Sequence, residues 1–113
     1  MHEISICESI LGVLKDQARE QKFDRVSRVC VEIGPLSGVE IEALKFGFDV
    51  VMRGSIAEDA ILDIIETPAK AWCHSCGKDF VIAERYDPCP ECGSYQLQVT
   101  SGEEMRIKQL EVN

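Results

Sequence analysis

The spacing of four cysteines constrains this chain more than any other feature. Cys73 and Cys76 form one C-x-x-C pair, and Cys89 and Cys92 form a second. A glycine follows each pair, and glycine tolerates the positive φ with which the chain turns away after the last cysteine. Two such turns facing each other place four sulfur ligands at about 2.3 Å from one ion, the arrangement of a closed, structural tetrahedral site. We therefore expect residues 68–101 to form a small metal-stabilised ribbon.

Disulfides and iron are the alternatives to zinc at these cysteines. The opening residues Met1-His2-Glu3 do not resemble the start of a signal peptide, so we expect no export and a reducing, cytoplasmic compartment. A rubredoxin-type iron site uses the same four thiolates in the same tetrahedral geometry. We favour zinc because a lone zinc ribbon is the commoner use of such turns. Ferric thiolate would colour the purified protein red, whereas zinc is silent in the visible range.

The charge balance argues against nucleic acid as a partner. The formal net charge is −8, and acidic residues outnumber basic ones even within the predicted ribbon. Affinity for DNA or RNA comes largely from phosphates neutralised by basic side chains. No apolar run approaches the roughly 18 residues that would suggest a membrane span. We expect neither a nucleic acid nor a membrane partner.

Hydrophobic periodicity predicts the remaining elements. Helical spacing predicts a helix from Ile4 to about Glu20, with Cys7 on its buried stripe as a small structural residue. A second helix is predicted from about Val39 to Arg53, opened by a capping box of Ser37 and Glu40. Alternation predicts strands at residues 25–34, 60–66 and 105–112, the last with a bulge near Gln109. Short strand candidates next to the cysteine turns lie at residues 69–72, 79–83 and 95–100.

The order of these elements predicts the architecture. The last strand needs neighbours in a sheet, and those neighbours precede the ribbon in sequence. The fold class expected is therefore α+β: two helices packed on a small, mainly antiparallel sheet, with an inserted zinc-ribbon lobe. The corresponding domains are residues 1–67 completed by a return strand at 102–113, and residues 68–101.

No group of residues resembles a catalytic site. The chain has two histidines, no thiol beside a predicted base and no glycine-rich loop of the kind that binds phosphates. We therefore expect a protein that is not an enzyme.

His2 stands out because of its position next to the amino terminus. Its imidazole Nδ1, its backbone nitrogen and the terminal amine of Met1 can chelate one metal. A fourth ligand can come from the backbone nitrogen or carboxylate of Glu3, or from another part of the chain. Deprotonated amide nitrogen suits square-planar Ni(II) or Cu(II) rather than zinc. Such a site is exposed and loses affinity as its ligands take up protons, which suits a metal that is passed on. The alternative is a frayed terminal residue without a role.

His74 has two interpretations of its own. It lies between the cysteines of the first pair, so it is either a spare ligand or pH-sensitive neighbour of the thiolates, or an exposed residue of the turn.

Several segments together resemble one family. Residues 1–3 run directly into a helix carrying Ser5 and Cys7, the first strand ends in the segment 32–40, the second helix ends in Val-Met-Arg-Gly-Ser at 51–55, and the cysteine ribbon follows. In order and spacing these segments resemble the HypA/HybF family, accessory proteins that deliver nickel for the maturation of NiFe-hydrogenases. The resemblance covers essentially the whole chain.

The resemblance implies two metals and two partners. It implies transient nickel at His2, helped by the Met1 amine and Glu3. It also implies a maturation GTPase of the HypB type and the hydrogenase large-subunit precursor as partners. Structural zinc is implied at Cys73, Cys76, Cys89 and Cys92. Relatives often carry a histidine just after a cysteine pair, whereas this chain has Gly77 and Gly93.

A second hypothesis is an acidic zinc-ribbon adaptor that binds only proteins, with His2 incidental. Nickel stoichiometry separates the two hypotheses, because the adaptor should bind zinc alone.

Overall fold

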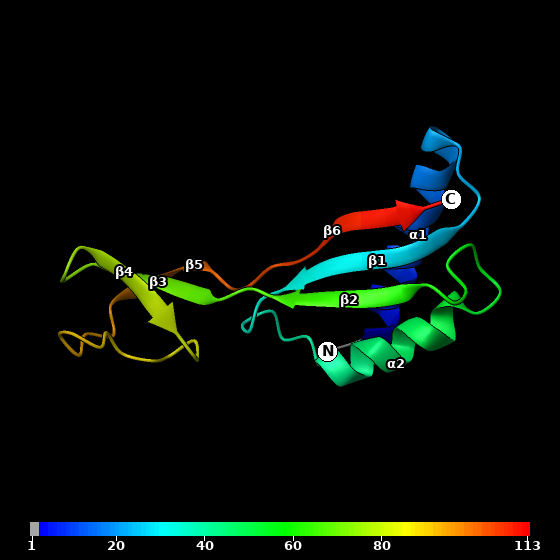
Figure 1. The fold of residues 1–113 in the computed structure, drawn as a ribbon. Coiled ribbons are helices and arrows are strands. Elements are labelled where there is room, and N and C mark those ends of the chain that lie inside the picture. The colour runs from blue at the N-terminus through cyan, green and yellow to red at the C-terminus, as the bar shows by residue number, and fades with distance from the viewer. Residues whose placement is uncertain (1–2) are drawn as a thin grey trace.

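The computed structural model describes residues 3–113, in which the chain forms two helices and six strands. The elements are α1 (Glu3–Gln21), β1 (Val26–Ile33), α2 (Ile41–Met52), β2 (Ile61–Glu66), β3 (Ala69–Cys73), β4 (Lys78–Ile82), β5 (Leu97–Ser101) and β6 (Met105–Val112). The molecule is elongated, with extents of 53 × 26 × 17 Å, and carries one sheet towards each end (Figure 1). Neither helix has the length and apolar character needed to cross a membrane.

We call the larger end of the molecule the body; it comprises α1, α2, β1, β2 and β6. Its sheet has the order β2-β1-β6, with β1 and β2 parallel and β1 and β6 antiparallel. The apolar residues of β1, among them Val29 and Val31, alternate with polar ones because successive side chains of a strand point to opposite faces. These valines are buried with Leu14 of α1 and with Leu44 and Met52 of α2, so both helices cover one face of the sheet.

We call the smaller end the ribbon lobe; it comprises β3, β4 and β5 and lies between β2 and β6 in sequence. Its sheet has the order β4-β3-β5, and both pairings are antiparallel. The buried core of this lobe apart from cysteines is only Ala69, Ala71 and Ile82. The predicted α+β fold with an inserted ribbon lobe is confirmed, and β1–β2 is the one parallel pairing among the described strands.

The predicted bulge in the last strand is confirmed. The β1–β6 register shifts between Cys30 and Val31, which lie opposite Gln109 and Ile107, so Lys108 is the inserted residue. The bulge lets apolar side chains on both sides of it face the helices, which explains the slip in the sequence alternation.

The predicted capping box of α2 is wrong. Helix α2 begins at Ile41, its N-cap residue Glu40 makes no side-chain cap, and the Ser37 hydroxyl accepts a hydrogen bond from the Val39 amide instead. The amide of Glu40 donates to the Glu3 carboxylate at 3.1 Å. A helix start needs acceptors for its free amides, and here a side chain from α1 supplies one of them. Met52, near the end of α2, is fully buried.

The body and the ribbon lobe meet at a tight crossing of two chain segments. A β-carbon on Gly34 would lie 2.1 Å from the carbonyl oxygen of Gly102, so only glycine fits at position 34 without a shift of backbone. The amide of Leu36 donates a hydrogen bond to the Gly102 carbonyl at 2.7 Å, and Leu36 packs on the apolar core of the ribbon lobe. Arg85 of the ribbon lobe pairs with Glu103 at 2.7 Å and donates to the Leu36 carbonyl. These contacts fix the orientation of one lobe on the other.

Glu104 stabilises this crossing through its carboxylate, which accepts hydrogen bonds from the Thr67 hydroxyl and the Gly102 amide. A hydrogen bond from its own backbone amide lowers the pKa of the Glu104 carboxyl most, and the hydrogen bond from the Gly102 amide is the next largest cause. A carboxyl whose pKa is lower in the folded state stabilises the protein at pH values above its pKa in the unfolded state. This contribution disappears as the pH falls through its pKa in the folded state.

We expect Glu104→Gln to unfold at a lower urea concentration than the parent protein at neutral pH, with the difference shrinking as the pH is lowered. Urea titrations of both proteins at a series of pH values measure this difference. A difference that stays constant with pH would mean that the carboxylate charge is not its source.

Candidate metal centres

The four cysteines of the predicted zinc site converge in the ribbon lobe. The sulfurs of Cys73, Cys76, Cys89 and Cys92 all lie within 4.8 Å of one another. The Cys73 and Cys92 sulfurs are 3.7 Å apart, and those of Cys76 and Cys89 are 3.8 Å apart. Four thiolates around one zinc at about 2.3 Å stand about 3.8 Å apart by tetrahedral geometry. The donor set is therefore of the right kind and the right size for a tetrahedral ion.

The turns that hold these sulfurs form as the sequence predicts. The amide of Gly77 donates to the Cys73 carbonyl at 2.8 Å, and the amide of Gly93 donates to the Cys89 carbonyl at 2.9 Å. The two glycines have φ values of 66° and 74°, which side chains rarely adopt. β3 ends at Cys73, so the sheet of the ribbon lobe positions the first turn directly.

The protonation of the cluster fits a site that exchanges protons for a cation. The backbone N–H of Cys92 lowers the pKa of the Cys89 thiol to about 7. A hydrogen bond with the Cys92 side chain raises the pKa of Cys76 to about 12. The thiols of the cluster thus perturb one another's pKa values, and zinc binding releases protons from a set of thiols. The four-cysteine cluster is consistent with structural zinc.

His74 is not part of this cluster. The cluster found among residues 3–113 consists of the cysteines alone. His74 is exposed, and its backbone amide donates a hydrogen bond to the Gln96 carbonyl at 3.3 Å. Of the two interpretations of His74, the structure supports the exposed turn residue.

The predicted nickel site lies only partly within the described residues. Met1 and His2 lie outside them, and Glu3 is the first described residue and begins α1. The Oε2 atom of Glu3 accepts the Glu40 amide at the start of α2. A helix N-terminus favours a carboxylate because the peptide dipoles give it partial positive charge. The structure thus brings the predicted ligand Glu3 together with Glu40, a residue 37 positions further along the chain.

The packing of α1 against α2 holds Glu3 at this position. A β-carbon on Gly47 would lie 3.0 Å from the Ile4 side chain, so the small residue allows the two helices to approach closely. Cys7 is fully buried beside it, and its thiol donates to the Leu44 carbonyl at 3.5 Å. Burial, with a smaller contribution from Glu3, raises the pKa of Cys7 to about 11. The prediction that Cys7 is a structural residue is confirmed.

A hollow of about 280 Å³ adjoins the start of α2. Its lining includes Glu40 and Glu66, the latter the last residue of β2. Glu66 carries no signal of its own in the sequence, because only the pairing of β2 with β1 brings its strand end to this place. The lining is completed by Ile33, Gly34, Pro35, Val39 and Ile41.

Comparison with known sequences identifies one family over the whole chain. Residues 1–112 match the family model described as HypA, hydrogenase/urease nickel incorporation, metallochaperone. The hydrogenase maturation factor HypA of Azotobacter chroococcum is 55% identical over 112 residues, which cover 99% of each chain. The hydrogenase maturation factor HypA 2 of Bradyrhizobium diazoefficiens is 53% identical over 113 residues, which cover the full length of both chains.

Comparison with solved structures gives the same result. The solution structure of the Ni metallochaperone HypA from Helicobacter pylori superposes with a TM-score of 0.72 and 31% sequence identity. The match covers 99% of this chain and 97% of that structure.

Proposed function

Because the chain belongs to the HypA family, the nickel metallochaperones of hydrogenase maturation, we propose that its amino-terminal residues bind the Ni(II) that it delivers. Members of the family are non-enzymatic, so nickel is cargo and no reaction is catalysed. The proposed ligands are the Met1 amine, His2 and Glu3. This protein is a nickel metallochaperone for NiFe-hydrogenase maturation, and the finer assignment of its ligands is the proposal.

The observation that carries the ligand assignment is the position of Glu3. The hydrogen bond from the Glu40 amide holds the Glu3 carboxylate at the junction of α1 and α2, and Glu3 directly follows Met1 and His2 in the sequence. An amine, an imidazole and a carboxylate in consecutive residues suit Ni(II), and all of them must lose protons before they bind it. Nickel bound there is expected to leave by ligand exchange with an acceptor.

The proposed zinc ligands are Cys73, Cys76, Cys89 and Cys92. The sulfur distances described above support the assignment. Four protein ligands leave no open position, so zinc there would be a structural metal that keeps the ribbon lobe folded.

We further propose two domains with different metals. Residues 1–67 together with 102–113 would form the nickel-binding domain, and residues 68–101 the zinc-binding domain. The two sheets, each with its own apolar cluster, support this division.

The proposed partners are a maturation GTPase of the HypB type and the large-subunit precursor of NiFe-hydrogenase. Similarity to hydrogenase maturation factors supports both proposals. The proposed compartment is the cytoplasm, because all six cysteines are free, which fits a reducing environment.

Nickel stoichiometry is the test of this function. The untagged protein, loaded with zinc and titrated with Ni(II) in a calorimeter, should bind one nickel in addition to one zinc. A protein that binds zinc and no second divalent ion would contradict the nickel assignment and favour the acidic zinc-ribbon adaptor.

A further inference from the structure

The two glycines inside the described helices have different surroundings. A glycine inside a helix lowers the stability of that helix relative to alanine. At Gly12 in α1 an added β-carbon would meet nothing within 4 Å. At Gly47 in α2 it would lie 3.0 Å from Cδ1 of Ile4 and 3.4 Å from the sulfur of Cys7. Of these two glycines, Gly47 is therefore the one whose missing side chain makes room for the other helix.

The contact at Gly47 involves the first turn of α1, the turn that begins with Glu3. Gly47 is buried, and the neighbouring Cys7 and Leu44 are fully buried, so this contact is closed to water. The hydrogen bond from the Glu40 amide to Glu3, at 3.1 Å, is exposed instead. An exposed hydrogen bond exchanges with water and by itself holds a side chain weakly. The buried helix contact, more than the hydrogen bond, therefore determines where Glu3 lies.

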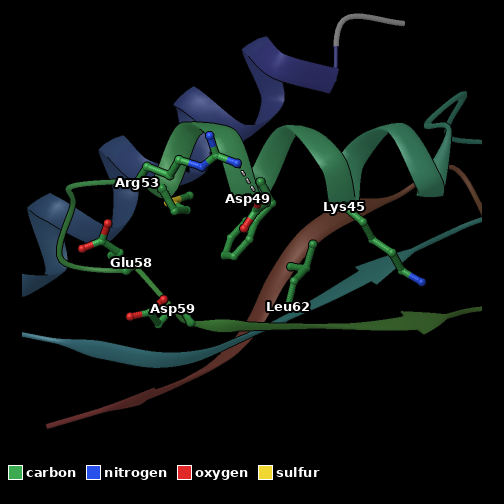
Figure 2. A pocket seen from close by; sticks show the side chains of 10 residues that line it. Lys45, Asp49, Arg53, Glu58, Asp59 and Leu62 are labelled. Carbon is green, nitrogen blue, oxygen red and sulfur yellow. Dashed lines mark hydrogen bonds and ion pairs between the residues drawn. The ribbon is translucent and has the colours of Figure 1, made fainter.

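The flank of α2 that faces β2 is packed less tightly. A hollow of about 600 Å³ lies between α2 and β2, with Asp49 on the helix side and Leu62 on the strand side (Figure 2). A large side chain at position 47 would push the two helices apart, and this hollow gives α2 room to move. Such a movement increases the distance between Glu3 and the Glu40 amide.

We propose that Gly47 is a positioning residue of the nickel site: the close helix contact that it allows holds Glu3 where it binds Ni(II) together with the Met1 amine and His2. Donors bind one ligand tightly when they are held within about 0.5 Å of the geometry of the bound state. Glu3 is the proposed donor that begins α1, so the position of α1 on α2 sets the position of this donor. The inference rests on the proposed function, because it takes Glu3 as a nickel ligand.

The test makes the same substitution at both glycines. Leucine is a good helix former, so Gly47→Leu and Gly12→Leu gain similar helix propensity and differ in what the new side chain meets. We expect Gly47→Leu to bind Ni(II) at least about tenfold more weakly than the parent protein, which is the lower end of the loss when the partner that orients a metal ligand is removed. Gly12→Leu should bind Ni(II) as the parent protein does. Calorimetric titration of the untagged, zinc-loaded proteins measures both affinities.

A double variant shows whether Gly47 acts through Glu3. Glu3→Ala removes the carboxylate, and adding Gly47→Leu to it should lower the nickel affinity no further. A substitution that only destabilises the body lowers the affinity by the same factor in both backgrounds, because independent effects add. Equal additional losses in the parent protein and in Glu3→Ala would overturn the inference. A Gly47→Leu protein that binds nickel like the parent protein would overturn it as well.

A smaller pair of variants replaces this comparison where leucine unfolds the body. Gly47→Ala places its β-carbon against Cδ1 of Ile4, and Ile4→Val removes that atom. We expect a measurable loss of nickel affinity in Gly47→Ala and the parent affinity in Gly47→Ala/Ile4→Val. The inference is wrong if Gly47→Ala binds nickel unchanged, or if Ile4→Val does not restore the affinity.

Amide exchange of the metal-free proteins, measured by NMR, gives a second result that does not depend on nickel. The Glu40 amide should exchange faster in Gly47→Leu and in Glu3→Ala than in the parent protein, and at the parent rate in Gly12→Leu. An unchanged rate in Gly47→Leu would contradict the displacement of Glu3 on which the inference depends.

Failure of this inference is distinguishable from failure of the proposed function. A parent protein that binds no nickel overturns the proposed function, and the role of Gly47 falls with it. A parent protein that binds nickel, with weaker binding in Glu3→Ala and unchanged binding in Gly47→Leu, overturns the inference alone.

Discussion

Replacement of His2 with alanine is expected to lower the affinity for Ni(II) by about 100-fold or more. Even the replacement of a residue that only hydrogen-bonds to a metal ligand typically lowers metal affinity by about 10- to 100-fold. The variant loses the imidazole that would complete the chelate with the terminal amine and leaves Glu3 as the remaining side-chain donor. Zinc content should stay at one per chain, because the cluster in the ribbon lobe consists of cysteines alone. Calorimetric titration of untagged, zinc-loaded protein at neutral pH measures the loss.

His74→Ala is the matched control for this experiment. It removes the second histidine of the chain, which is exposed and not part of the cysteine cluster, and should leave the nickel affinity unchanged. An acetyl group or tag on Met1 should weaken nickel binding, because it removes the amine donor. Equal affinities of the parent protein and His2→Ala would end the amino-terminal assignment.

The second large effect is expected from Cys73→Ser, which should lose zinc and unfold the ribbon lobe while the body stays folded. The ribbon lobe has too little apolar core to fold without metal, with two alanines and one isoleucine buried besides its cysteines. Structural zinc contributes on the order of 10–16 kcal/mol in zinc-finger peptides, far more than such a core can supply. Zinc analysis and amide hydrogen exchange, residue by residue, measure both effects.

Cys30→Ser provides the control for the cysteine change. Cys30 lies half-buried in β1, outside the cluster, and its replacement should leave one zinc per chain. Nickel binding should survive largely intact in Cys73→Ser, because the proposed ligand Glu3 begins α1, in the body. Loss of zinc and nickel to the same extent would contradict the division into two metal-binding domains.

The sequence by itself determined the features that depend on neighbouring residues. The cysteine turns need only the C-x-x-C spacing and a following glycine, so the gathering of the four cysteines could be predicted. Helical and strand periodicities placed the elements within a few residues of their observed limits, and the slipped alternation near Gln109 predicted the bulge. The insertion of the ribbon followed from the order of elements alone.

Tertiary structure decided what depends on residues far apart in the chain. The start of α2 is capped by Glu3, not by the local pair Ser37 and Glu40, because helix packing brings a carboxylate from α1 to the free amide. The parallel pairing of β2 with β1 brings Glu66 towards Glu40. Periodicity along a chain shows which face of an element is buried, but the partner of that face is selected by packing energy summed over the whole fold.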